Sequence, residues 1–69
     1  MSKTVSITTE FIRLDALMKL SSLCDTGGQA KAEIQNGAVL VNGEVCTQRG
    51  RKIRVGDTVT FGDKAVTVQ

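Results

Sequence analysis

Apolar and polar residues alternate near both ends of the chain. Thr4-Val5-Ser6-Ile7-Thr8 carries a β-branched apolar residue at every second position, and Ala65-Val66-Thr67-Val68-Gln69 has the same period. Because successive side chains of a strand point to opposite faces of a sheet, both segments are predicted to be short strands with one buried face.

The apolar spacing becomes helical between Glu10 and Leu23. The stripe is formed by four leucines and widened by two further residues: Leu14, Leu17, Leu20, Leu23, Phe11 and Met18. Apolar residues three and four positions apart lie on one face of a helix, so the pattern predicts a first helix over residues 10–23.

A second, shorter helix is predicted over residues 28–36. Asp25-Thr26-Gly27-Gly28 interrupts the first helix, and Thr26 is followed three positions later by Gln29, the spacing of a capping box. Ala30 and Ile34 would be buried, and Gly37 would supply the left-handed residue that ends the helix.

Alternation with a period of two returns from Val39. Asn42-Gly43 between two apolar runs predicts a tight hairpin. In Lys52-Ile53-Arg54-Val55 the two apolar residues are expected to face inward and the two cations outward. Gly56-Asp57 and Gly62-Asp63 are turns on either side of a strand over residues 58–61.

One strand, two helices and a run of short strands predict the α+β class. The two phenylalanines, Phe11 and Phe61, are both assigned to the core. The predicted core is Val5, Ile7, Leu14, Leu17, Leu20, Ile34, Val39, Val41, Ile53, Val55, Val59, Phe61, Val66 and Val68.

Composition argues against an enzyme or a metalloprotein. The chain has 69 residues, no histidine and two cysteines, so the commonest general base is absent and a four-ligand zinc site cannot be assembled. Cys24 and Cys46 are expected to be reduced packing residues. We expect one domain over residues 1–69, without catalytic residues, metal, cofactor or small-molecule substrate.

The N-terminal sequence lacks the apolar run of a signal peptide, and no stretch has the length of a membrane span. The sequence therefore predicts a cytoplasmic protein with no membrane partner. We also expect it to be a monomer.

The net charge of +2 is unevenly distributed. Residues 45–56 carry +4 without any acid, whereas the rest of the chain has a net charge of −2. The cations lie in Arg49-Gly50-Arg51-Lys52-Ile53-Arg54, which we call the basic arm. Guanidinium groups donate paired hydrogen bonds to phosphate oxygens, so the arm suits a polyanion, and Lys19 and Lys31 add helical cations. The alternative is a solvated charged loop.

Thr26-Gly27-Gly28 is a second candidate anion site. Two residues without side chains leave the first N–H groups of the second helix open to a phosphate. The alternative is that the two glycines only make a flexible turn between the helices. With both phenylalanines assigned to the core, no stacking platform is expected, which favours folded RNA over single strands.

Several motifs in order are similar to the S4 RNA-binding domain. They are Arg13-Leu14-Asp15-Ala16-Leu17, Gly28-x-Ala30-Lys31, Ile34-x-x-Gly37-x-Val39-x-Val41-Asn42-Gly43 and Val55-Gly56-Asp57. They span residues 13–59. The glycine turn and the basic arm resemble small bacterial proteins that consist of this domain alone.

The resemblance implies an L-shaped helix pair packed on a small sheet of short strands, with structured RNA, ribosomal RNA in particular, held along the second helix and the arm. The RNA-binding residues it implies are Lys31, Arg49, Arg51 and Lys52, together with Arg13 and Lys19. Arg54 of the arm and the turn residues Gly27 and Gly28 complete the candidate site. Many S4 domains have Ser-Arg where this chain has Gly27-Gly28, so one usual basic contact is missing.

Two other functions fit part of the sequence. A protein-interaction module would use Arg49–Arg54 to meet an acidic partner. Val39-x-Val41-Asn42-Gly43-Glu44-Val45 followed by Gly56-Asp57-x-Val59 is similar to ubiquitin-like sulfur carriers, but these end in Gly-Gly and this sequence ends in Val66-Thr67-Val68-Gln69.

Overall fold

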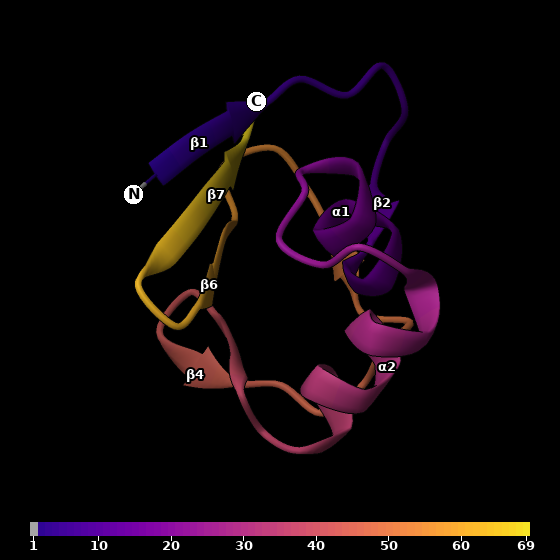
Figure 1. Cartoon of the computed structure of the whole chain (residues 1–69). Helices are drawn as coiled ribbons and strands as arrows, with labels where there is room; N and C mark the ends of the chain where they lie inside the picture. The colour runs from indigo at the N-terminus through magenta and orange to yellow at the C-terminus, as the bar shows by residue number, and fades with distance from the viewer. Residues whose placement is uncertain (1) are drawn as a thin grey trace.

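The computed structural model describes residues 2–69. It contains a five-stranded sheet and two helices. The sheet contains β1 (Ser2–Val5), β3 (Val39–Val41), β4 (Glu44–Val45), β6 (Thr58–Phe61) and β7 (Lys64–Val68). Their order is β1-β7-β6-β3-β4, with β1 parallel to β7 and the other neighbours antiparallel. Helices α1 (Leu14–Leu20) and α2 (Gly27–Gln35) lie on one side of this sheet, which confirms the α+β class (Figure 1).

A separate two-stranded ladder joins the start of α1 to the basic arm. Strand β2 (Ile12–Arg13) pairs antiparallel with β5 (Lys52–Ile53), with Ile12 opposite Ile53 and Arg13 opposite Lys52. This pairing shortens the first helix, because the residues before Leu14 are extended. The predicted helix over 10–23 therefore exists only from Leu14 to Leu20.

The end of α1 is set by Ser21 and Ser22. The Ser21 hydroxyl donates to the carbonyl of Leu17 at 2.7 Å, and Ser22 has a left-handed φ of 63°. Leu23 and Cys24 follow outside the helix but are buried, with their N–H groups donating to the carbonyl of Met18.

The local turn signals in the sequence are confirmed, except for one of the two bonds of the capping box. The Thr26 hydroxyl accepts the N–H of Gln29 at 3.1 Å, and the Gln29 side chain accepts the N–H of Asp25 at 3.0 Å, one residue before the position expected of a capping box. Gly37 has φ +79° where α2 ends, and Asn42 and Gly43 have φ values of 52° and +85° in the β3–β4 hairpin.

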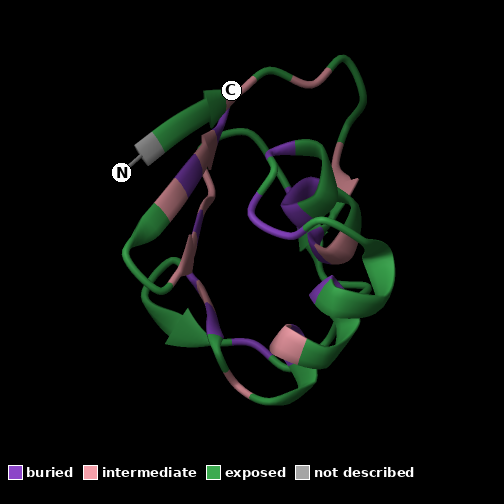
Figure 2. Ribbon diagram, in the orientation of Figure 1, coloured by how far each residue is buried: buried purple, intermediate pink, exposed green. Residues whose placement is uncertain are grey.

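The core lies between the sheet and the helices (Figure 2). Its buried apolar side chains are Leu14, Leu17, Met18, Leu23, Cys24, Ala30, Ile34, Val39, Val41, Cys46, Ile53, Val59, Val66 and Val68. The half-buried side chains of Val5, Ile7, Ile12 and Phe61 pack against it. Both cysteines are free and buried, as expected of packing residues.

Two predicted core residues are exposed instead. Leu20 is 61% exposed, because the buried face of α1 is formed by Leu14, Leu17 and Met18, and the centre of that face lies about 110° around the helix from Leu20. Val55 is 63% exposed, because the chain turns at Arg54–Asp57 before β5 can extend, with the N–H of Asp57 bonded to the carbonyl of Arg54. Within residues 2–69, no helix is long and apolar enough to cross a membrane.

Candidate nucleic-acid interface

The backbone of the basic arm closes the first turn of α1. The N–H of Leu14 donates to the carbonyl of Arg51 at 2.9 Å, and the N–H of Asp15 donates to the carbonyl of Arg49 at 3.1 Å. The first N–H groups of a helix lack partners within the helix, and here the arm supplies them. The side chains of Arg49, Arg51, Lys52 and Arg54 are all exposed. The arm is thus fixed through its main chain while its cations face solvent.

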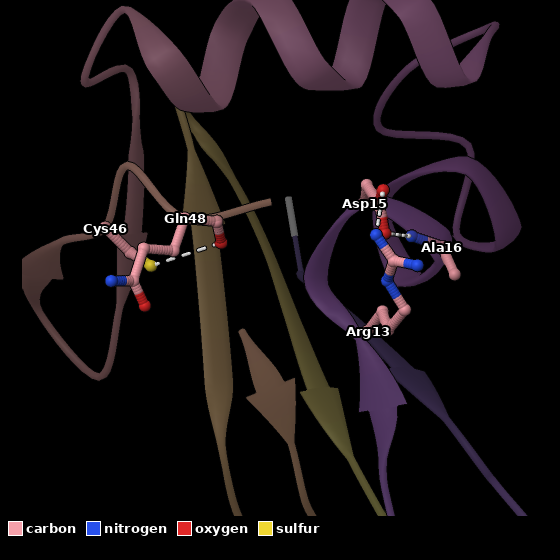
Figure 3. Close-up of polar contacts among 5 residues, drawn as sticks. All are labelled: Arg13, Asp15, Ala16, Cys46 and Gln48. Carbon is pink, nitrogen blue, oxygen red and sulfur yellow. Dashed lines mark hydrogen bonds and ion pairs between the residues drawn. The ribbon is translucent and has the colours of Figure 1, made fainter. Parts of the chain in front are cut away.

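Arg13 lies beside the arm. A Cβ placed on Gly50 would be 3.8 Å from a guanidinium nitrogen of Arg13. The same guanidinium forms an ion pair with the Asp15 carboxylate at 3.3 Å, whose other oxygen accepts the N–H of Ala16 at 2.8 Å (Figure 3). Asp15 was not predicted as part of the site. Its carboxylate pairs with Arg13 at the start of α1.

An open groove brings together three of the predicted site residues. It has a volume of about 290 Å³ and is lined by Arg13, Asp15, Ala16, Lys19 and Gly27. The groove therefore runs from the start of α1 to the start of α2, with a cation from each end of α1. No local sequence pattern indicates this juxtaposition, because it depends on how the two helices pack.

The remaining predicted residues lie outside the lining of this groove. Lys31 is exposed on α2 one turn beyond Gly27, and residues four positions apart share a helix face, so Lys31 continues the groove side of α2. Gly28 is exposed in the first turn of α2. Arg54 lies at the far end of the arm, where its N–H donates to the Asp57 carboxylate at 2.9 Å.

Phe11 departs from its predicted place in the core. The residue is half-buried, and the ammonium of Lys52 lies over its ring, 5.0 Å from the centroid. Phe61, by contrast, packs against the core as expected. The assignment of Phe11 to the core assumed that the helix includes residue 11. The chain is instead extended up to Leu14, which moves Phe11 next to the arm.

Among residues 2–69, two side chains have shifted pKa values. The N–H of Arg54 and the side-chain amide of Asn42 donate to Asp57, and these bonds hold the pKa of its carboxyl below the ordinary value. Burial, together with the nearby charges of Glu33 and Asp25, raises the pKa of the Cys24 thiol. Cys24 therefore stays a neutral thiol, and Asp57 stays an anion that fixes the turn after the arm.

The Cys46 thiol makes a hydrogen bond just before the arm, donating to the carbonyl of Gln48 at 3.7 Å (Figure 3).

No cluster of metal-ligating side chains is found among the described residues. Residues 2–69 contain no group of three or more cysteine, aspartate or glutamate side chains able to hold a metal ion. The arm presents exposed cations on a backbone that is hydrogen-bonded to the start of α1. Such a surface binds anions through charge and multiple hydrogen bonds.

Comparison with known proteins shows the family of this chain. The S4 domain model matches residues 5–69. A probable ribosome maturation protein, RlbA of Bacillus subtilis, is 44% identical over 59 residues, which are 86% of this chain and 83% of that protein. A putative RNA-binding protein, YbcJ of Escherichia coli, is 40% identical over 57 residues, which are 83% of this chain and 81% of that protein.

Two solved structures are similar to this one. The solution structure of YbcJ from E. coli, described as revealing a motif involved in RNA binding, has a TM-score of 0.73 at 38% identity and covers 94% of this chain and 84% of its own. A pseudouridylate synthase has a TM-score of 0.72 at 30% identity over 81% of this chain. The match spans only 24% of that enzyme's chain.

Proposed function

Because this chain belongs to the S4 domain family, we propose that it binds structured RNA without catalysing a reaction on it. The observation that carries the proposal is the groove that joins Arg13, Lys19 and Gly27 beside the basic arm. RNA presents closely spaced phosphates, and clustered arginines on a fixed backbone match that charge density.

The proposed contacts are the predicted site residues. Arg49, Arg51 and Lys52 of the arm provide most of the affinity, and Arg13 and Lys19 in the groove contact the same backbone. Lys31, Gly27 and Gly28 on α2 and Arg54 at the end of the arm extend the contact. We propose ribosomal RNA as the ligand, supported by the name of the B. subtilis relative.

The interface is tested by replacing Arg49, Arg51 and Lys52 together with alanine. The main-chain carbonyls that close α1 remain in this variant, so the melting temperature should change little. Affinity for a duplex-containing RNA should fall severely. If the variant melts normally and binds RNA with wild-type affinity and salt dependence, the arm is a solvated loop and the proposed interface is wrong.

A matched pair of lysines provides the control. Lys31 and Lys64 are both exposed, but Lys31 lies on the groove side of α2 and Lys64 begins β7. Lys31→Ala should weaken RNA binding by the loss of one phosphate contact, and Lys64→Ala should leave it unchanged. Crosslinking in cells identifies the ligand. Recovery of an acidic protein instead of RNA would favour the protein-interaction function.

A further inference from the structure

One aromatic ring lies at the basic surface without serving the core. The side chains that pack against the core from its edge are Val5, Ile7, Ile12 and Phe61, and Phe11 is not one of them in the described chain. Phe11 is half-buried and directly precedes β2, whose Arg13 is paired with Lys52 of β5. The ring therefore lies within two residues of a groove cation and against an arm cation.

The contact with Lys52 indicates which side of the ring is accessible. The ammonium of Lys52 lies 5.0 Å from the ring centroid, and Lys52 itself is exposed. Because Lys52 is an exposed residue, its position over the ring indicates that this face of the ring borders solvent. An exposed cation–π contact is weak, so a stronger partner for either group displaces it.

We propose that the ring of Phe11 is a stacking platform for one unpaired nucleobase of the bound RNA. Lys52 occupies the ring face in the free protein and moves to a phosphate when RNA binds, which leaves the face to the base. This inference rests on the proposed RNA-binding function and adds a ligand class to it, namely a duplex that carries an unpaired nucleotide next to the arm.

The preference for an unpaired base follows from stacking chemistry. A base inside a duplex is stacked on both faces and cannot reach a side-chain ring, whereas a bulged or terminal base has a free face. Every base has a π face, so a single ring selects unpaired nucleotides without selecting a base type. The cations of the arm and groove hold the adjoining duplex through its phosphates.

The test compares two RNAs that differ by one nucleotide: a fully paired hairpin stem and the same stem with a single bulged 2-aminopurine. Wild-type protein should bind the bulged RNA roughly 5- to 160-fold more tightly, the range expected of one base–aromatic stack. Binding should also quench the 2-aminopurine fluorescence. Equal affinity for the two RNAs without quenching would overturn the proposal.

Three variants separate stacking from folding. Phe11→Leu keeps an apolar side chain but removes the ring, so the preference and the quenching should disappear while affinity for the paired stem stays the same. Phe11→Tyr keeps a ring and should retain both, which covers the possibility that Phe11→Leu folds poorly. Phe61→Leu makes the same change at the core edge and should retain the preference.

Binding to the paired stem distinguishes failure of the proposed RNA-binding function from failure of the stacking proposal. If wild-type protein binds the paired stem and the alanine variant of Arg49, Arg51 and Lys52 does not, the proposed function stands whatever Phe11 does. If Phe11→Leu then keeps the wild-type preference for the bulged RNA, only the stacking proposal fails. If wild-type protein binds neither RNA, both proposals fail.

Discussion

The carbonyl of Arg51 accepts the N–H of Leu14 at 2.9 Å, so the residue that presents a cation to solvent also closes the first turn of α1. The two roles use different parts of Arg51, since the hydrogen bond is made by the main chain and the guanidinium is exposed. Binding and folding can therefore be separated by substitution at the side chain.

Lysine substitutions test how the arm recognises its ligand. Arg49→Lys together with Arg51→Lys keeps both charges but replaces planar, multi-donor groups with point charges. If phosphate oxygens are held by paired guanidinium hydrogen bonds, RNA affinity should drop markedly in a binding titration. Unchanged affinity would mean that the arm acts through simple charge attraction.

The salt dependence of binding counts the phosphate contacts. Each neutralised phosphate contributes a slope of about −0.7 to −0.9 to a plot of log affinity against log salt concentration, and we expect about three to five such contacts. Lys31→Ala removes one phosphate contact and should make the slope shallower by about 0.7 to 0.9. A wild-type slope near zero would contradict binding through the cations.

Two leucines on α1 test the core assignment. Leu17 is fully buried and Leu20 is 61% exposed, although both belong to the same predicted stripe. Leu17→Ala should lower the free energy of unfolding by about 2 to 5 kcal/mol in a urea titration. Leu20→Ala should change it by less than about 0.5 kcal/mol. Similar losses for both variants would show that the buried face of α1 is misplaced.

Acid should destabilise the fold in part through Asp57. Its carboxylate accepts the N–H of Arg54 and the amide of Asn42, which lowers the pKa of Asp57 in the folded state. Because the folded pKa lies below the unfolded value of about 3.9, this contribution is complete above that pH and is lost as the pH falls through the folded pKa.

The comparison of wild type with Asp57→Asn measures this contribution. The difference in free energy of unfolding should shrink as the pH is lowered from about 7 to about 2, because protonated Asp57 loses its advantage over asparagine. A difference for Asp57→Asn that does not vary with pH would contradict the role of its charge.

The features that could be predicted from the sequence are those with a local physical cause. Thr26 accepts the N–H of Gln29 as a cap, and the left-handed Asn42-Gly43 pair makes the hairpin. These structures depend on residues a few positions apart. The S4 family was also identifiable from the order of such local signals.

The features that could not be predicted depend on pairing between distant segments. Helical periodicity places Phe11 in a helix, but the ladder of Ile12 with Ile53 holds the chain there extended. Val55 lies two positions after Ile53, so the alternation of a strand predicts that both are buried. Val55 is exposed instead, because the turn at Asp57 ends the strand. Helical or strand periodicity contains no information about which distant segment will compete for the same residues.

The parallel pairing of β1 with β7 has a consequence for folding kinetics. Ser2 lies opposite Ala65 and Val5 opposite Val68, so all other elements lie between the paired strands in sequence. Closing so long a loop costs conformational entropy before any of its contacts form, and topologies rich in such contacts fold slowly. We expect the β3–β4 hairpin and the helix pair to form early. Strand β1 should dock late, and its amides should be among the first to exchange with solvent.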